Sequence, residues 1–331
     1  MKTRIISVIL ALLLLAGLYV LVLFFNKTVT LNVMPQTFDG VNYNNYLEDN
    51  RLDYKDGTIA WLDYALFNPK LIYKDGKGEQ TVLAGVRSPF QLTGSGVAYI
   101  KNGDLILKDT DSKKTVTAAE DVKRFLVFGD RIIYSALTDA DNCRYGLYVY
   151  DMSRNAKKKI HENVEWFYIN GGRLFAVNGE YTLFELSFDS GDAKEIIRLP
   201  VKSLPVFFMP VGEKLMYSLD GIYIFDTDTG REEKIAFSDG TYVNDKIRFI
   251  CDDSRIFVSF RATKTDGSVV MDIDDDANGL WSIDPVTLEK VKICSDVFDR
   301  LYLFGDTLFG AKENGLYRID VQTKQIEKIT E

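Results

Sequence analysis

One short motif recurs along the chain and limits what it can fold into. It reads Gly-Leu-Tyr-Val-Tyr-Asp at residues 146–151 and returns in closely related form at residues 221–226, 279–284 and 315–320. Aromatic and β-branched residues favour strands, whereas Gly and Asp favour turns. A strand that recurs in this way indicates that the chain is assembled from copies of one supersecondary unit.

Each copy of the unit contains four expected strands. In one unit these are an apolar strand at 124–128, a second at 131–134, the motif strand at 147–150 and a basic strand at 157–160. The second and third strands can each be found seven times, and residues 40–331 divided by seven give about 42 residues per unit. That is the size of a four-stranded propeller blade. The sequence therefore predicts an all-β fold, a seven-bladed β-propeller of four-stranded antiparallel blades, with six or eight blades as alternatives.

The distribution of apolar residues within a unit favours a closed ring over separate β-sandwich domains. In the motif strand, Tyr148 and Tyr150 face one way and Leu147 and Val149 the other, so both faces are apolar, as expected for a sheet packed between neighbours. The fourth strands are charged, which suits an outer edge in water. We expect the first blade to use residues 43–52 as its inner strand. Whether a strand is exchanged across the seam is left open.

The N-terminal segment predicts a membrane anchor. Residues 5–25 carry no charge and are long enough to span a bilayer as a helix. Lys2 and Arg4 precede them, which places the N-terminus in the cytoplasm. A cleaved signal peptide is the alternative, but no A-x-A exit follows the apolar run. We therefore expect a cytoplasmic N-terminus (1–4), a transmembrane signal anchor (5–25), a linker (26–40) and the propeller (41–331), the last lying outside the cytoplasmic membrane in a bacterial cell envelope.

The pattern resembles a family of bacterial membrane-anchored β-propeller proteins that are grouped as a domain of unknown function and likened to LDL-receptor-type propellers. The resemblance is carried by residues 129–134, Gly-Asp-Arg-Ile-Ile-Tyr, and by the Gly-Leu-Tyr motif that follows. It covers most of residues 42–331. The resemblance implies a membrane-tethered or secreted binding domain and brings no catalytic residues with it.

Composition argues against several classes of function. The formal net charge is -8, and an acidic body is a poor match for nucleic acid, whose phosphates need a basic surface. His161 is the single histidine, and neither a Gly-x-Ser-x-Gly elbow nor a phosphate-binding glycine loop occurs. The three cysteines form no CxxC pair. We therefore assign no catalytic residue and no organic cofactor.

An acidic loop at residues 271–279 is the one place where a metal is considered. Asp274, Asp276, Asn278 and Gly279 match the first six positions of a calcium-binding loop. The bidentate glutamate is missing, because position twelve is Pro285. The sequence leaves two interpretations, a calcium site formed by Asp274, Asp276 and Asn278 or a solvated acidic loop, and the missing glutamate favours the second.

Two long connections between second and third strands predict a binding rim. They span residues 136–145 and 261–278, and in a propeller all such connections emerge on one face. Loops on a rigid scaffold commonly carry function. The charged residues predicted to form this rim are Asp139, Asp141, Arg144, Asp272 and Asp275.

The sequence thus predicts a propeller that binds a protein or peptide partner in the cell envelope. The N-terminal helix is expected to anchor this propeller to the membrane. Two alternatives remain, because a fold does not dictate a function. A carbohydrate or small-ligand sensor would present exposed aromatic platforms, and Trp166 is the first residue to inspect. A propeller-type hydrolase or lyase would need convergent carboxylates around the central axis.

Overall fold

The computed structural model describes residues 14, 15, 17, 41–47, 51–63, 69–86, 89–110, 112–141, 144–199, 208–218, 222–235, 243–265, 270–272, 276–313 and 315–330. Within these ranges no helix is long and apolar enough to cross a bilayer. The predicted anchor and linker lie outside the described residues, except for three residues of the anchor. These are Leu14, Leu15 and Gly17, which are helical.

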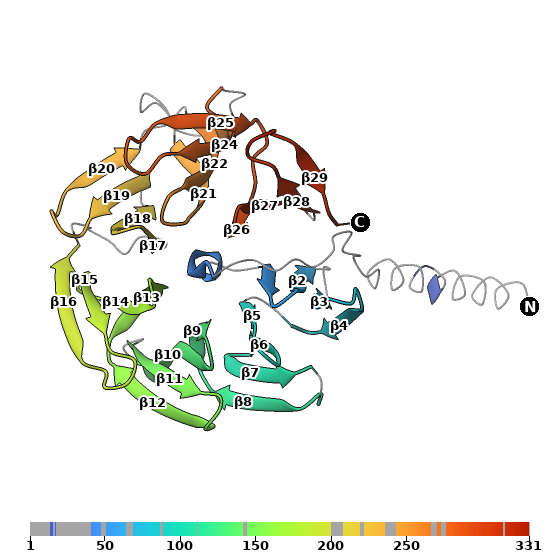
Figure 1. The fold of residues 1–331 in the computed structure, drawn as a ribbon, viewed down its shortest axis with the longest axis vertical. Helices are drawn as coiled ribbons and strands as arrows, with labels where there is room; N and C mark the ends of the chain where they lie inside the picture. Colours follow the sequence, from blue (N-terminus) through green and yellow to red (C-terminus); the bar gives the residue numbers. More distant parts are fainter. Residues whose placement is uncertain are drawn as a thin grey trace, which may run out of the picture.

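The strands form seven antiparallel sheets arranged as blades around a central axis (Figure 1). Blade 1 contains β1 (Leu52–Lys55), β2 (Thr58–Asp63), β3 (Lys70–Lys74) and β4 (Gln80–Ala84). Blade 2 contains β5 (Phe90–Leu92), β6 (Gly96–Lys101), β7 (Asp104–Asp109) and β8 (Thr115–Ala119). Blade 3 contains β9 (Val122–Phe128), β10 (Arg131–Asp139), β11 (Arg144–Asp151) and β12 (Ala156–His161). Blade 4 contains β13 (Val164–Asn170), β14 (Arg173–Asn178), β15 (Thr182–Leu186) and β16 (Ala193–Arg198).

Blade 5 contains β17 (Phe208–Val211), β18 (Lys214–Ser218), β19 (Ile222–Asp226) and β20 (Glu232–Ile235). Blade 6 contains β21 (Val243–Cys251), β22 (Ile256–Thr265), β24 (Gly279–Ile283) and β25 (Lys290–Cys294), and a short β23 (Val270–Asp272) pairs with the end of β22. Blade 7 contains β26 (Arg300–Phe304), β27 (Thr307–Lys312), β28 (Gly315–Ile319) and β29 (Ile326–Lys328). The predicted count of seven four-stranded units is confirmed, with β23 as an addition.

In blades 3 and 7 the recurring glycine is explained by the aromatic residue two positions later. A Cβ on Gly146 would lie only 3.1 Å from Cε2 of Tyr148, and a Cβ on Gly315 would lie 2.9 Å from Cε2 of Tyr317. The tyrosine ring therefore folds back over the glycine of its own strand. In both blades a lysine of the outer strand, Lys159 or Lys328, approaches the same position at 3.1 Å. Any larger residue would push these side chains apart.

The aspartate that ends the motif organises the next turn. Oδ1 of Asp226 accepts hydrogen bonds from the backbone N–H groups of Asp228 at 3.0 Å and Thr229 at 2.8 Å. Asp284 and Asp320 make the equivalent pairs of bonds two and three residues on. Each side chain thereby closes the tight turn between the third and fourth strands.

The core is a succession of apolar layers between blades. The inner three strands of each blade are largely buried, whereas the outer strands are mostly exposed, as in β12, where the first four residues face water. This confirms the expectation that the charged fourth strands form the outer edges of the blades.

The seam between blades 7 and 1 is closed by apolar packing and by a hydrogen bond from the N–H of Arg51 to the hydroxyl of Tyr302 at 2.9 Å. Within the described residues, each blade is built from consecutive strands, and no strand passes from one blade to the other. Leu52 and Tyr54 of blade 1 pack in one buried cluster with Phe304 and Phe309 of blade 7. The Tyr54 ring lies 5.1 Å from the Phe304 ring and 5.6 Å from the Phe309 ring. Aromatic packing therefore closes the ring.

The prediction for the inner strand of blade 1 is wrong. Residues 43–52 were expected to form that strand, but β1 begins only at Leu52, and η1 (Tyr43–Tyr46) is a turn of 3-10 helix. The two consecutive asparagines are poor strand formers. Their side chains instead bond to backbone groups of other blades, which holds η1 in the middle of the ring (Figure 1).

Candidate functional site

A short plug, consisting of Asn42 and η1, lies in the central channel. The Asn42 side chain caps the helix by accepting a hydrogen bond from the N–H of Asn44 at 3.1 Å. Its Nδ2 donates to the carbonyl of Cys251 in blade 6 at 3.1 Å. The plug is thus ordered by its own cap and anchored to an inner strand.

Asn44 and Asn45 connect the plug to three consecutive blades. Nδ2 of Asn44 donates to the carbonyl of Pro210 in blade 5 at 3.0 Å and to that of Cys251 in blade 6 at 2.8 Å. Nδ2 of Asn45 donates to the carbonyl of Leu303 in blade 7 at 2.7 Å. These side chains satisfy backbone groups on the free inner edges of the sheets, which no further strand covers.

On the other side, the plug reaches blades 1 and 2 through a buried carboxyl group. The hydroxyl of Tyr46 donates to Oδ1 of Asp53 in β1 at 2.6 Å, and the N–H of Leu92 in β5 donates to Oδ2 at 2.6 Å. Burial raises the pKa of Asp53 to about 7, although the hydrogen bonds from Tyr46 and Leu92 act in the opposite direction. The plug therefore bonds to the blades on both sides of the seam.

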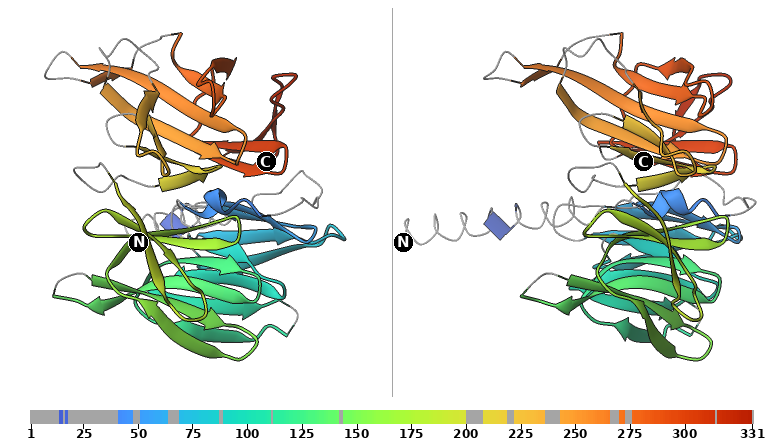
Figure 2. Two further views of the ribbon diagram at one scale, coloured as in Figure 1. Left: turned by 60° about the vertical axis from the view of Figure 1, so that its left-hand side comes forward. Right: turned by 90° about the vertical axis from the view of Figure 1, so that its left-hand side faces the viewer.

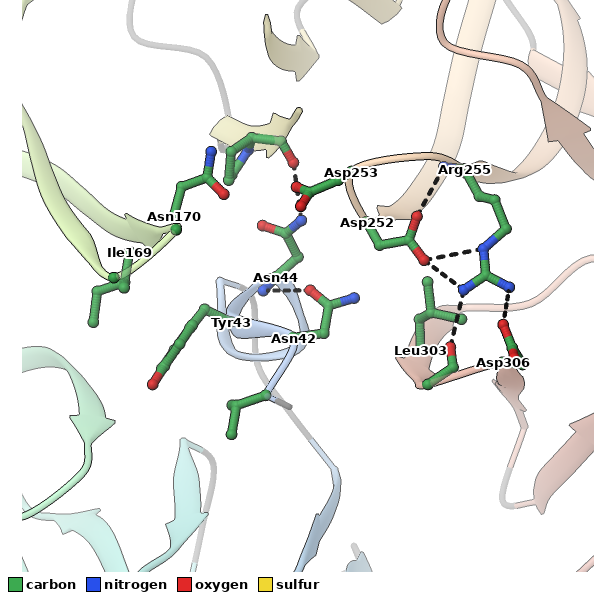
Figure 3. Close-up of a pocket in the computed structure, with 15 residues that line it drawn as sticks. Asn42, Tyr43, Asn44, Ile169, Asn170, Asp252, Asp253, Arg255, Leu303 and Asp306 are labelled. Carbon is green, nitrogen blue, oxygen red and sulfur yellow. Dashed lines mark hydrogen bonds and ion pairs between the residues drawn. The ribbon is translucent and has the colours of Figure 1, made fainter. Parts of the chain in front are cut away.

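A cavity of about 410 Å³ lies where the plug meets the turns between first and second strands of the surrounding blades. Its walls are Asn42 and Asn44 of the plug, Asn170 of blade 4 and the 252–255 turn of blade 6. Figure 3 shows these side chains around one space, with Arg255 and Asp306 on one side of it. Polar and apolar atoms contribute nearly equally to the lining, and its charged side chains and amides suit a charged or hydrogen-bonding ligand.

Arg255 is held by two blades. Its Nε and Nη2 donate to Oδ2 of Asp252 at 3.0 and 2.5 Å, and its Nη1 donates to Oδ1 of Asp306 in blade 7 at 2.8 Å. Burial raises the pKa of Asp252, but the hydrogen bonds from Arg255 and Ser254 outweigh it, so that the pKa lies below its usual value. Asp252 is therefore ionised at neutral pH, and its charge is committed to Arg255.

Two acceptors in the cavity are not committed in this way. Oδ1 of Asn44 is buried and finds no hydrogen-bond partner in the part of the chain that the structure describes. Because its Nδ2 already bonds to two carbonyls, exchanging the two amide atoms would not relieve this. Asp253 is exposed beside it and lines the same cavity. With three lining carboxylates, Asp252, Asp253 and Asp306, and one guanidinium, the formal charge is -3 + 1 = -2.

The predicted acidic rim lies on the opposite face from this cavity. The 252–255 turn joins β21 to β22 beside the Cys251–Ile256 pair, whereas Asp272 pairs with Thr263 at the far end of β22. Likewise, Asp139 and Arg144 pair at the end of β10 that lies away from its turn with β9. In Figure 2 the hairpins of blades 3 and 6 project on the same side of the ring. The prediction of a shared face agrees with this arrangement.

The structure does not gather the rim residues into one cluster. Asp139, Asp141 and Arg144 belong to blade 3, and Asp272 belongs to blade 6, so that blades 4 and 5 separate them along the chain. The N–H of Asp141 donates to Oδ1 of Asp139 at 3.1 Å, which is a local turn contact. Asp275 lies outside the described residues. A function for this rim stays a prediction.

The calcium interpretation also stays a prediction. Asp274 lies outside the described residues, whereas Asp276 is exposed and Asn278 half-buried. The backbone carbonyl of Asp276 accepts a hydrogen bond from Nζ of Lys292 at 2.7 Å. Among the residues that the structure describes, no three His, Cys, Asp or Glu side chains are grouped to hold a metal ion.

Trp166 is not an open platform for a sugar ring. The guanidinium carbon of Arg124 lies 3.8 Å from its ring centroid, so one face of the indole is covered. His161 lies on the outer strand of blade 3, where its ring is 5.6 Å from that of Phe184. Neither residue lines the cavity at the plug.

Sequence reasoning missed the plug and its cavity. One signal was available: the Asn-Tyr-Asn-Asn-Tyr run at residues 42–46 is far more polar than the inner strands of the other units. The lining residues of blades 4, 6 and 7 carry no such signal, since Asn, Gly and Asp are what any tight turn contains.

Comparison with solved structures shows the fold. The β-propeller domain of the Trilobed protease from Pyrococcus furiosus, described as having an open velcro topology, matches with a TM-score of 0.52 at 10% identity, over 86% of this chain and 98% of that one. Acylaminoacyl peptidase from Pyrococcus horikoshii matches with a TM-score of 0.52 at 11% identity, over 86% of this chain and 52% of that one. The tricorn protease matches with a TM-score of 0.48 at 10% identity, over 88% of this chain and 36% of that one.

This chain therefore spans about half of the peptidase and little more than a third of the tricorn protease. No protein-family model and no curated protein matches the sequence. The chain has a seven-bladed β-propeller fold. These comparisons assign it to no family.

Proposed function

We propose that the chain is a binding module, tethered to the cytoplasmic membrane and facing outward, which holds a basic segment of a protein or peptide at the plugged end of its channel. The cavity beside the plug carries this proposal. It combines a formal charge of -2 with a buried acceptor, Oδ1 of Asn44, that has no donor among the described residues. A buried polar atom without a partner costs about 1–3 kcal/mol, which a ligand that donates a hydrogen bond would recover.

The charge of the cavity favours a cationic ligand. Arg255 does not repel such a ligand strongly, because its guanidinium is paired with the carboxylates of Asp252 and Asp306. The side chain of a lysine or arginine provides both the positive charge and the N–H groups. Asp253 lines the cavity and has no ion-pair partner in the described part of the chain, so it is the carboxylate best placed to pair with the ligand.

The exposure of the surrounding turns favours a polypeptide over a small molecule. Asp253 is exposed at the edge of the cavity, and the Asp306 side chain is 97% exposed. A segment that inserts one basic side chain could therefore continue across these turns. Function on a propeller commonly resides in such loops, held by a rigid ring.

Selection of peptides against the full chain in detergent tests this function. Displayed peptides bound by the wild type should be enriched in lysine or arginine, and their affinity should fall as salt is raised. Asp253→Asn should weaken binding at least tenfold. Asp130→Asn is the matched control, because Asp130 occupies an equivalent exposed turn in blade 3 but does not line the cavity. Peptides without basic residues, or equal binding by Asp253→Asn, would refute the proposal.

The location is a separate proposal that rests on the uncharged run at residues 5–25 preceded by Lys2 and Arg4. Protease added to intact spheroplasts should degrade the propeller while a cytoplasmic marker survives. Protection of the propeller until the membrane is broken would place it in the cytoplasm.

A further inference from the structure

Arg124 and Trp166 form a stacked pair on the inner strands of neighbouring blades. Arg124 lies on β9 and Trp166 on β13, and the guanidinium carbon is 3.8 Å from the indole centroid. The Phe167 ring centroid lies 5.0 Å from the same carbon. Attraction between the cation and the ring faces fixes the plane of the guanidinium group.

The donors of this pair have no acceptors. Nε, Nη1 and Nη2 of Arg124 and Nε1 of Trp166 are all shielded from solvent, and none has a hydrogen-bond partner in the part of the chain that the structure describes. Burial lowers the pKa of Arg124 to about 9, which still leaves it charged at neutral pH. A buried charge without a counterion is strongly destabilising, so native proteins normally pair it.

Other arginines of the ring do find acceptors. Arg248, on the corresponding strand of blade 6, donates through Nε to the carbonyl of Asp299 at 3.2 Å. Arg255 has the carboxylates of Asp252 and Asp306. The lack of acceptors around Arg124 is therefore a property of its place in blade 3 and not of arginine in this fold.

The carboxylate that neighbours Trp166 in the sequence is engaged by another cation. Oε2 of Glu165, next to Trp166, lies 3.8 Å from Nζ of Lys123. The same ammonium lies 4.3 Å from the centroid of the Tyr145 ring. Lys123 and Glu165 thus neutralise one another and leave the charge of Arg124 uncompensated.

The pair is distinct from the cavity at the plug. Arg124 and Trp166 each lie four residues before the end of their strands, Phe128 and Asn170. At about 3.3 Å per residue, that places them roughly 13 Å along the channel from the cavity, toward the face of the hairpin of blade 3. A ligand site at this pair can therefore be tested independently of the function proposed for the plug.

We propose that Arg124 and Trp166 bind a carboxylate group. Because the indole covers one face of the guanidinium, its N–H groups point outward in the plane without an acceptor among the described residues, which is the geometry of a bidentate pair with a planar carboxylate. The indole N–H adds a further donor beside it. The carboxylate could belong to a small acid or to the end of a peptide chain, and the same chemistry serves both.

Thermal unfolding of the full chain in detergent tests this site. At pH 7 and constant ionic strength, replacing chloride by acetate should raise the melting temperature in a saturable way, because a ligand that binds only the native state stabilises it. N-acetylglycine serves as the probe for a peptide terminus, and uncharged N-acetylglycinamide is its control. Tighter binding of N-acetylglycine than of acetate assigns the site to a peptide terminus, and equal binding assigns it to a small acid.

Substitutions locate the effect. Arg124→Met should abolish the acetate-dependent shift, and Trp166→Phe, which keeps a ring but lacks the N–H, should weaken acetate binding severalfold. Arg173→Met is the control, since Arg173 is paired with Glu185 within blade 4, and it should respond as the wild type does.

Tryptophan fluorescence of the wild type gives a readout that does not depend on how well a variant folds. Acetate should change it saturably and chloride should not. An unfolding temperature and a fluorescence signal that are the same in acetate and chloride would overturn the proposal. A larger response to phosphate than to acetate would overturn the assignment to a carboxylate.

Discussion

The side chain of Asn45 pairs with the backbone of Leu303 through two hydrogen bonds. Its Nδ2 donates to the carbonyl at 2.7 Å, and its Oδ1 accepts from the N–H at 2.7 Å. One amide side chain thereby satisfies both edge groups of an inner-strand residue, as a neighbouring strand would do. Asn45 is 3% exposed, so water does not compete for these bonds.

Asn45→Ala should destabilise the native state by about 2–6 kcal/mol. The substitution leaves a buried N–H and a buried carbonyl of Leu303 without partners, at about 1–3 kcal/mol each. Denaturant unfolding followed by circular dichroism measures the change. Asn42→Ala, which removes a partly buried helix cap, should cost only about 1 kcal/mol. An Asn45→Ala chain as stable as the wild type would show that the plug does not stabilise the ring.

Asp53 should make stability fall as pH rises from about 4 to about 7. Its pKa is raised to about 7 in the native state by burial, so the native state keeps a proton that the unfolded chain has already lost. The contribution is full below the unfolded pKa and is lost as pH passes the native pKa, with a slope of at most about 1.4 kcal/mol per pH unit. Unfolding free energies across pH 4–8 should show this slope in the wild type.

Asp53→Asn is the control for that slope. The amide can still bond to Tyr46 and to the N–H of Leu92, but it does not titrate. The difference in unfolding free energy between variant and wild type should therefore change across pH 4–7 and level off above it. A difference that is constant with pH would show that Asp53 is ionised in the native state throughout.

The ring could be predicted from the sequence because its cause is local and repeated. Gly146 and Tyr148 are two residues apart, and Asp226 closes a turn with Thr229 three residues on. Such short-range relations predict the blade, and seven copies of the second and third strands predict the number of blades. The inner strand of blade 1 was misassigned because Asn44 and Asn45 take their conformation from partners elsewhere in the chain.

The candidate sites could not be predicted because their residues meet only in the closed ring. Asn44 and Cys251 are 207 positions apart, and nothing local marks Cys251 as a partner. Arg124 and Trp166 hold equivalent places in adjacent repeats, so aligning the repeats could have placed them side by side. Packing in the closed ring decides which donors are left without acceptors, and no sequence pattern predicts this outcome.

Asp226→Ala should lower the melting temperature. Hydrogen bonds from the backbone of Thr229, the side chain of Thr229 and the backbone of Asp228 hold the pKa of Asp226 below its usual value. A depressed pKa means that the stabilisation is present above the unfolded pKa and is lost as pH falls below it. The destabilisation by the variant should therefore shrink toward pH 3.

Asp228→Ala is the matched control for that experiment, since Asp228 is exposed in the same turn. It should leave the melting temperature near that of the wild type. Equal effects of the two substitutions would contradict the assignment of Asp226 as the residue that closes the turn.

Phe309→Ala should weaken the seam specifically. Phe309 is 1% exposed and stacks on Tyr54 across the junction of blades 7 and 1, so its loss should cost about 3–5 kcal/mol. Phe90→Ala, at a fully buried position in blade 2, should cost a similar amount. In hydrogen exchange, Phe309→Ala should accelerate blades 1 and 7 together, whereas Phe90→Ala should not accelerate blade 7. The same pattern in both variants would argue against a separate seam.

Hydrogen exchange with a bound basic peptide tests the central claim most directly, because it reports which face of the ring is covered. A lysine-containing peptide selected against the full chain should protect the plug at residues 42–46 and the 252–255 turn, and this protection should vanish in Asp253→Asn. Protection confined to the blade 3 hairpin around residues 139–144, with the plug unchanged, would contradict the account and move the binding face to the acidic rim.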